Sequence, residues 1–172
     1  MLGAHQGRNA AISAALAELA GANSEAIERG ISEAHLPCRL ELVSKNPKVL
    51  MDCAHNPHAA KVLAKSLDLF DYDRLILVIG MMRDKDHNGF FKELGPKSGL
   101  LVLNQPDYPR AMDLAGIFNI GKRYRPKAIG VKDVKNSLEL AKKLAGPDDL
   151  ICVTGSIYML SEARGNPPSV AQ

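Results

Sequence analysis

The 172-residue sequence contains no tryptophan, and only 5% of its residues are aromatic. Its formal net charge is only +3, and the basic residues are scattered along the chain. A nucleic-acid surface usually combines a basic patch with aromatic stacking groups, so nucleic acid is not indicated as a partner. With 46% hydrophobic and 24% charged residues, the composition is typical of a folded globular protein and argues against disorder.

Long apolar runs are also missing. The longest, LILVIGMM, is far too short for a membrane helix, which needs about 20 residues. The N-terminal residues MLGAHQGRN lack the apolar core of a signal peptide. We therefore expect a cytoplasmic protein without a membrane partner, in which the three cysteines, Cys38, Cys53 and Cys152, are thiols.

A complete phosphate-binding loop is a third missing feature. The segment GIFNIGKR, residues 116–123, approaches the pattern G-x-x-x-x-G-K-[ST], but Arg123 stands where the Mg²⁺-binding hydroxyl belongs. Its glycines also lie within a helical pattern instead of between a strand and a helix. We interpret Gly121 as a residue near a helix C-terminus.

Apolar runs that alternate with helical patterns are present from Cys38 onward. This alternation predicts a Rossmann-like α/β fold, with a mostly parallel six-stranded sheet and helices on both faces. A tight turn, SKNP, joins the first two strands, so the first should be an antiparallel edge strand. Two helices, 5–20 and about 23–34, precede the sheet. The expected strands are 38–43, 48–52, 74–80, 100–104, 127–131 and 149–155, and the expected helices between and after them begin at Pro57, Asp86, Pro109, Val134 and Ser156.

The hairpin turn also predicts a register, because placing Ser44 opposite Pro47 puts apolar residues on one face. Counting outward gives the pairs Leu42–Val49, Leu40–Met51, Arg39–Asp52 and Cys38–Cys53. Opposed Cβ atoms lie about 4.5–5.5 Å apart, slightly more than a disulfide prefers. We expect Cys38 and Cys53 to be neighbours and free thiols.

Polar residues gather after the strands, in the segments DCAHNP, GMMRDKD, NQPDYPR and TGS. The carboxyl ends of parallel strands share one edge of the sheet, where ligands bind in open α/β folds. The side chains that could face one crevice there, suited to an anionic ligand, are Asp52, His55, Lys85, Arg110 and Ser156.

The segment VLMDCAHNPHAAKVL, residues 49–63, allows two readings of this edge. Asn56 and Pro57 are typical of a helix start. Asp52 and His55 either face a ligand, or Asp52 caps a backbone N–H and His55 is a packed loop residue. A metal site is a weaker alternative, since its candidates His35 and His58 would fall near or within helices; the full candidate set is His35, Cys38, Cys53, His55 and His58.

Five motifs together resemble a known family. In order and spacing, GAHQGRNAA, LPCRLE, DCAHNP, GMMRDKD and VTGSIYML resemble the C-terminal half of folylpolyglutamate synthase/dihydrofolate synthase, of the Mur ligase superfamily. The resemblance covers about residues 2–164. Where the family motifs have glycine in P-G-R and D-G-A-H-N-P, this sequence has Cys38 and Cys53.

The resemblance implies an ATP-dependent amide ligase, in which a folate or pterin carboxylate is phosphorylated and then attacked by the amine of glutamate. By the same resemblance, Asn9 contacts adenine, Arg39 reaches the ATP phosphates and Asp52 binds the ribose, with His55 beside it as a catalytic group. Lys85 and Ser156 hold the carboxylate of the incoming amino acid, and Lys85 also assists catalysis. The cofactors implied are ATP and Mg²⁺, with no complete metal site on this chain.

The resemblance also predicts a domain organisation. Residues 1–36 look like a helical remnant of a preceding ATPase domain, 37–166 like the Mur-ligase C-terminal domain, and 167–172 like a loose tail. The ATPase domain would be a partner that carries most Mg²⁺ ligands, so we expect no activity from this chain alone. Without that domain, residues 1–36 would be poorly ordered or drawn into a homo-oligomer. The alternative function is a non-catalytic module that binds nucleotide or a protein partner.

Overall fold

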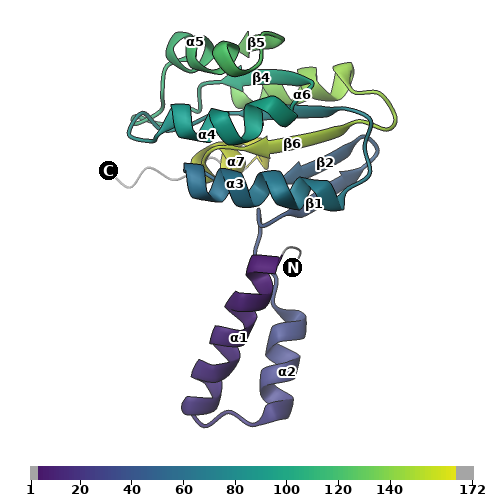
Figure 1. Cartoon of the computed structure of the whole chain (residues 1–172), viewed down its shortest axis with the longest axis vertical. Coiled ribbons are helices and arrows are strands. Elements are labelled where there is room, and N and C mark those ends of the chain that lie inside the picture. Colours follow the sequence, from purple (N-terminus) through teal and green to yellow (C-terminus); the bar gives the residue numbers. More distant parts are fainter. Residues whose placement is uncertain (1–3, 166–172) are drawn as a thin grey trace.

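The computed structural model describes residues 4–165, which form one six-stranded sheet with helices on both faces and a pair of helices that extends away from it (Figure 1). The strand order is β1-β2-β6-β3-β4-β5. Only β1 and β2 pair antiparallel, and β1 is an edge strand, so the predicted fold class and edge are confirmed. The strands are β1 (Glu41–Lys45), β2 (Lys48–Met51), β3 (Leu75–Ile79), β4 (Leu100–Asn104), β5 (Ala128–Val131) and β6 (Leu150–Thr154).

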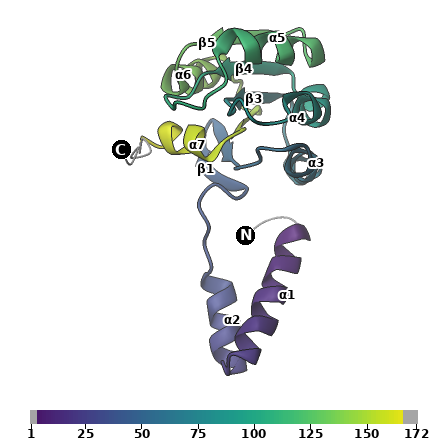
Figure 2. The same ribbon diagram turned by 90° about the vertical axis from the view of Figure 1, so that its left-hand side faces the viewer.

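Five helices cover the two faces of the sheet (Figure 2). On one face, α3 (Pro57–Ser66), α4 (His87–Leu94) and α5 (Leu114–Tyr124) pack over a core that contains Phe90 and Phe91. On the other face, α6 (Val134–Leu144) and α7 (Ile157–Ala163) pack over a second core. Short 3₁₀ turns, Leu67–Leu69 and Gly95–Lys97, follow α3 and α4.

The central strands β3 and β6 are buried along their whole length, which explains their continuous apolar sequences. Successive side chains of a strand point to opposite faces, so each strand contributes to both cores. In β3, Leu77 and Ile79 pack on the α3 side, whereas Ile76 and Val78 pack on the α6 side.

Local signals place most helix starts correctly. The Asn56 side chain accepts the N–H of Ala59 at 2.9 Å, and Pro57 is the first residue of α3. Asp86 caps α4 in the same way, and α6 spans Val134–Leu144 as predicted. The segment 116–123, which approaches a phosphate loop, lies within α5.

The predicted start of α5 at Pro109 is wrong, because the helix begins at Leu114. The backbone before it bonds to the loop after β3 instead: Met112 N–H donates to the carbonyl of Met81, and Ala111 bridges to Met82. The helix then starts where the Asp113 carboxylate accepts the N–H of Gly116 at 2.8 Å.

The predicted hairpin register is also wrong. The two-residue turn lies one residue later than predicted, at Asn46 and Pro47, so that Lys45 pairs with Lys48. A bulge then lies between Leu42 and Ser44, and the pairs beyond it are Leu42–Leu50 and Glu41–Met51. A bulge inserts an unpaired residue and shifts every side chain beyond it to the other face. Leu40 therefore packs with Leu50, on the face of the sheet opposite to Met51.

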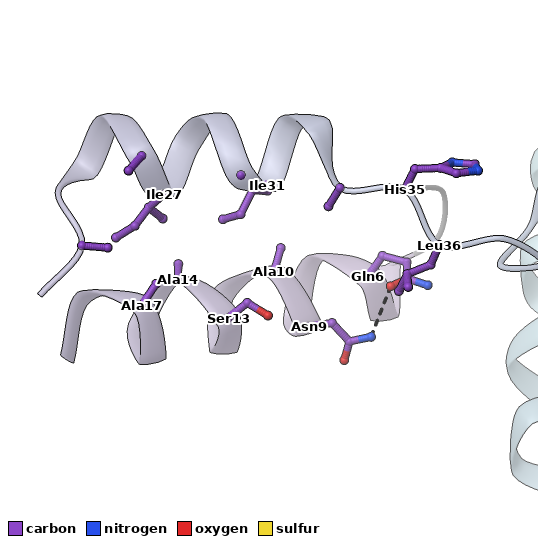
Figure 3. Close-up of a pocket in the computed structure, with 14 residues that line it drawn as sticks. Gln6, Asn9, Ala10, Ser13, Ala14, Ala17, Ile27, Ile31, His35 and Leu36 are labelled. Atoms are coloured by element: carbon purple, nitrogen blue, oxygen red, sulfur yellow. Dashed lines mark hydrogen bonds between the residues drawn. The ribbon is translucent and has the colours of Figure 1, made fainter. Parts of the chain in front are cut away.

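The helices α1 (Ala4–Leu19) and α2 (Ser24–Glu33), called the helix pair below, confirm the two predicted N-terminal helices. They enclose a groove of about 470 Å³ lined mainly by alanine, glycine and isoleucine (Figure 3). Among the described residues of α2, none is buried, and on α1 Leu16 is 62% exposed. Residues 167–172, expected to form a loose tail, lie outside the described residues. Within 4–165, the search for helices long and apolar enough to span a membrane finds none.

Candidate functional site

The segments after β2, β3, β4 and β6 share one edge of the sheet, because these four strands run parallel. The structure divides the predicted site residues on this edge into two groups. Asn9, Arg39 and Asp52 line one pocket, whereas Lys85 and Ser156 lie around the start of α7.

The pocket has a volume of about 220 Å³ and draws its walls from three separate parts of the chain. Asn9 comes from α1, Arg39 from the loop before β1, and Asp52 from the end of β2. The first turns of α3 complete the lining with His58 and Ala59. Sequence reasoning named the first three residues from separate motifs, and the fold brings them together.

Asp52 is 8% exposed, and its carboxylate is held from both sides. Oδ2 accepts the N–H of Leu40 at 3.1 Å, and Oδ1 accepts the N–H of Ala54 at 2.9 Å. The reading in which Asp52 caps backbone N–H groups is therefore correct as a local role. Because each carboxylate oxygen can accept more than one hydrogen bond, the same side chain can also bind a hydroxyl group in the pocket that it lines.

The loop that carries Arg39 has an unusual backbone. Cys38 and Leu40, on either side of Arg39, have φ values of 59° and 47°, in the left-handed region. The loop is fixed by the bond from Leu40 to Asp52 and by the Cys38 N–H, which donates to Glu41 Oε2 at 2.8 Å. Arg39 itself is exposed, so its guanidinium is available at the mouth of the pocket.

His55 is exposed, so the reading that makes it a packed loop residue is wrong. Its Nδ1 lies 3.1 Å from the carbonyl oxygen of Cys53. A carbonyl only accepts, so Nδ1 carries the proton and Nε2 of the neutral ring is left as an acceptor. His55 is not one of the residues that line the pocket of Asp52.

The second group surrounds Tyr158 in α7. The rings of Tyr108 and Tyr158 stack with centroids 3.9 Å apart, and Arg110 lies over both rings. A hydrogen bond with Tyr108, and then Arg110, lowers the pKa of Tyr158, and the positive charge of Lys85 acts in the same direction. The Ser156 hydroxyl accepts the N–H of Tyr158 at 3.1 Å and keeps its own proton to donate.

Three positive or donor groups therefore gather at the start of α7: Lys85, Arg110 and Ser156. Lys85 is half-buried and pairs with Asp84 at 2.8 Å. Sequence reasoning missed the two tyrosines, although both lie in segments quoted for other residues, DYPR and GSIYML. A larger cavity of about 740 Å³ adjoins this group, lined by Tyr108 and by residues that follow β4 and β5.

The candidate metal ligands do not form a site. Among residues 4–165, no three or more His, Cys, Asp or Glu side chains gather as they would around a metal ion. His35 instead pairs with Glu41 at 3.6 Å, and His58 lies inside α3. The described part of the chain therefore does not fit a bound Mg²⁺ on its own.

Comparison with known proteins places this geometry in a family. Residues 38–157 match the family model of the Mur ligase glutamate ligase domain. The chain belongs to the Mur ligase family. It corresponds to the C-terminal part of folylpolyglutamate synthases, as the resemblance predicted.

Relatives of this Mur ligase domain are longer proteins. The "Probable bifunctional folylpolyglutamate synthase/dihydropteroate synthase" of Haloferax volcanii is 40% identical over 167 residues, which are 95% of this chain and 20% of that protein. The folylpolyglutamate synthase of Mycobacterium tuberculosis, complexed with ADP and AMPPCP, superposes with a TM-score of 0.78 at 28% identity. That match covers 84% of this chain and 35% of the other.

A third relative shows which ligands such proteins hold. A bifunctional folylpolyglutamate synthase/dihydrofolate synthase with Mn, AMPPNP and L-glutamate bound has a TM-score of 0.75 at 29% identity, over 83% of this chain and 34% of that one. The Mur ligase domain described here thus spans a fifth to about a third of these three relatives.

Proposed function

We propose that this chain is the glutamate ligase domain of an ATP-dependent enzyme that joins glutamate to a folate or related pterin. One observation carries the proposal: Asn9, Arg39 and Asp52, from three separate elements, line a single pocket. The names of the relatives, and the nucleotide and L-glutamate bound to two of them, support the same reaction.

The pocket fits a nucleotide by the chemistry of its donors and acceptors. Arg39 offers an exposed guanidinium to phosphate oxygens, which it can bind with two parallel hydrogen bonds. Asp52 offers a fixed carboxylate to ribose hydroxyls, and Asn9 offers an amide to the base. When bound, ATP supplies the phosphoryl group that turns a carboxylate into an electrophile.

The group around Tyr158 serves the incoming amino acid. Lys85 and the Ser156 hydroxyl bind its carboxylate, and Arg110 adds a second positive charge beside them. His55 acts on the amine, because its Nε2 can take up the proton that the amine loses when it forms the amide. These roles hold the nucleophile in place, which is the main way such reactions are accelerated.

The helix pair packs, in this proposal, against an ATPase domain that carries the phosphate loop and most Mg²⁺ ligands. The exposed apolar side chains of α1 support this role, since large apolar surfaces usually mark an interface. Division of the chain into a helical part (1–36), a ligase domain (37–166) and a tail (167–172) belongs to the same proposal. The alternative is that a second copy of this chain covers the apolar surface of the helix pair and forms a homo-oligomer.

The test is a chimaera that joins this chain to the N-terminal part of the Haloferax volcanii relative. We expect glutamate- and folate-dependent ADP release from the chimaera and none from the 172-residue chain. Asp52→Ala and Arg39→Ala should each reduce kcat/KM by at least about tenfold, since each removes a charged contact to the nucleotide. Lys135→Ala, at an exposed position of α6, is the matched control and should change nothing.

Three results would count against parts of this proposal. Turnover by the isolated chain would show that the ATPase part is not needed. A chimaera that turns over equally well with Asp52→Ala would remove the pocket from the mechanism. A chimaera that binds ADP but releases no product would favour the non-catalytic binding module.

A further inference from the structure

Cys38 and Cys53 lie next to each other beside the nucleotide pocket, and the proposed reaction uses neither sulfur atom. The N–H of Cys53 donates to the carbonyl oxygen of Cys38 at 2.9 Å. Standard bond lengths then limit the separation of the two Cα atoms to about 7 Å at most. Disulfides span Cα separations of about 4.4–6.8 Å, so the pair is within reach of a bond.

The two side chains also share the same surroundings. Both belong to the core beneath α6 and α7, and they are only 6% and 9% exposed. Burial raises the pKa of the Cys53 thiol. The positive charge of Arg39 opposes this shift, and the charges of Asp52 and of the neighbouring Cys38 add to it. The third cysteine, Cys152, is fully buried in β6 and packs in the opposite core, which makes it an internal control.

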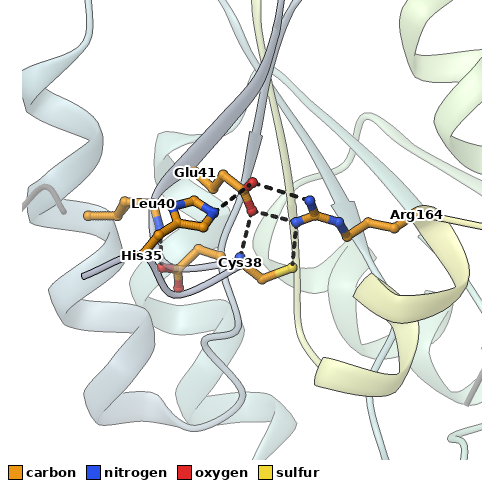
Figure 4. Close-up of polar contacts among 6 residues, drawn as sticks. His35, Cys38, Leu40, Glu41 and Arg164 are labelled. Atoms are coloured by element: carbon orange, nitrogen blue, oxygen red, sulfur yellow. Dashed lines mark hydrogen bonds and ion pairs between the residues drawn. The ribbon is translucent and has the colours of Figure 1, made fainter. Parts of the chain in front are cut away.

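The guanidinium of Arg164 lies directly beside the sulfur atom of Cys38. The Arg164 guanidinium is 3.6 Å from Cys38 Sγ, and it is held there by Glu41, which also accepts the Cys38 N–H (Figure 4). The Arg164 N–H donor can bind a negative charge that forms on this sulfur atom during the reaction. We therefore assign the attack to Cys38 and the resolving step to Cys53.

The backbone at Cys38 adds an independent observation. Its φ of 59° lies in the left-handed region, where a side chain is strained and glycine is favoured. Strained residues of this kind cluster at functional sites.

We propose that Cys38 and Cys53 are an oxidisable dithiol that a hydroperoxide converts into an intramolecular disulfide. The Cys38 thiolate attacks one peroxide oxygen and breaks the O–O bond, giving a sulfenic acid and releasing hydroxide, which takes up the thiol proton as water. The Cys53 sulfur then displaces the sulfenic oxygen as a second water and forms the S–S bond. The two sulfur atoms together lose two electrons, and one hydrogen peroxide is reduced to two waters.

The disulfide regulates the pocket, a consequence that rests on the proposed function. It joins the loop that carries Arg39 to the strand end that carries Asp52. Closing the 38–53 loop restricts the motion of these two segments, so the amides of Leu40 and Cys53 exchange more slowly with solvent in the oxidised protein.

The test is mass spectrometry of the full 172-residue chain treated with hydrogen peroxide. We expect the intact mass to fall by two hydrogen atoms, a 38–53 linkage in non-reducing peptide maps, and full reversal by dithiothreitol. Cys152→Ala should behave as the wild type, whereas Cys38→Ser and Cys53→Ser should lose the mass shift. If a serine variant does not fold, the wild-type peptide map still decides, because it identifies the joined sulfur atoms.

Three results would overturn the dithiol: no linkage, a linkage to Cys152, or Cys38 oxidised to sulfinic acid while Cys53 stays a thiol. Binding of ADP to the reduced chain is measured separately. A 38–53 disulfide without ADP binding would refute the nucleotide pocket and leave the dithiol standing, and ADP binding without a disulfide would do the reverse.

Discussion

In the sheet region, residues 38–165, every residue of β3 and β6 is buried, whereas α2 buries none of its ten residues and α1 leaves Leu19 86% exposed. Isolated helices of this length are marginal in water, and most helical stability in proteins comes from packing of an apolar face. The sheet region therefore buries a core of its own, whereas the helix pair leaves the apolar surface exposed that the proposed ATPase domain would cover.

The two regions nevertheless meet at one place. Asn9 of α1 lines the same pocket as Arg39 and Asp52, so the pocket is shared between the stable and the weakly packed part of the chain. Glu41 lies at the junction of the two regions, because it pairs with His35, which follows α2, and with Arg164, which follows α7.

The largest difference should appear when a leucine is truncated in each region. Leu77→Ala, in the middle of β3 and fully buried, should lower the free energy of unfolding by about 2–5 kcal/mol. Leu16→Ala, 62% exposed on α1, should change it by no more than about 0.5 kcal/mol. Urea unfolding followed by circular dichroism measures both. Similar losses would mean that the helix pair is part of the cooperative core.

Replacing glycine by alanine should have opposite signs in the two regions. Gly155, with φ of 115°, has the Gly80 carbonyl oxygen only 2.7 Å from where a Cβ would stand, so Gly155→Ala should destabilise by about 1–3 kcal/mol. Gly30 lies inside α2 with nothing within 4 Å of that position, so Gly30→Ala should stabilise the helix by up to about 1 kcal/mol. The unfolding temperature measures the effect of Gly155→Ala, and the helical content from circular dichroism measures the effect of Gly30→Ala. Effects of equal sign would contradict the contrast in packing.

A smaller, pH-dependent effect is expected at the junction. The hydrogen bond from Arg164, followed by that from the Cys38 N–H, lowers the pKa of Glu41 below its ordinary 4.5. A group whose pKa is lowered in the folded state stabilises the protein above its ordinary pKa and loses that contribution as the pH falls through the lowered value. Glu41→Gln should therefore cost about 1 kcal/mol at pH 7 and nothing at the acid end of the range.

The matched control for this pH effect is Glu139→Gln. The pKa of Glu139 is also lowered, by Lys142, but this pair is exposed on α6. Urea midpoints from pH 7 down to pH 3 should converge for wild type and Glu41→Gln, and should hardly separate for Glu139→Gln. If the difference between the Glu41→Gln and wild-type midpoints stays constant at all pH values, the ionised Glu41 carboxylate is not the cause of that difference.

Local chemistry accounts for what the sequence predicted well. The caps at Asn56 and Asp86 and the period of residues 134–144 act within a few residues, and the structure confirms them. The shared edge of the parallel strands followed from fold class alone, but of the five side chains expected to face one crevice there, only Asp52 lines the pocket. Asn9 and Arg39, which line it too, were named through the family resemblance.

Long-range contacts account for what the sequence did not predict. The loop before α5 bonds to the loop after β3, about 30 residues earlier, and so overrides the helix signal of Pro109. The bulge between Leu42 and Ser44 shifts the hairpin register, and nothing in the local pattern marks it. The stacked pair Tyr108–Tyr158 and the contact of Arg164 with Glu41 join distant segments, which single-sequence patterns cannot show.

The most direct test of the pocket is a titration of ADP into the ¹⁵N-labelled chain, followed by NMR amide shifts. The account predicts shifts at Asn9, Leu40, Ala54 and Ala59, which line the pocket or bond to Asp52, and none at Gln105 in the larger cavity. Arg39→Ala should abolish these shifts without unfolding the sheet. Shifts confined to Gln105 and its neighbours, or no shifts at millimolar ADP, would contradict the claim that this junction binds a nucleotide.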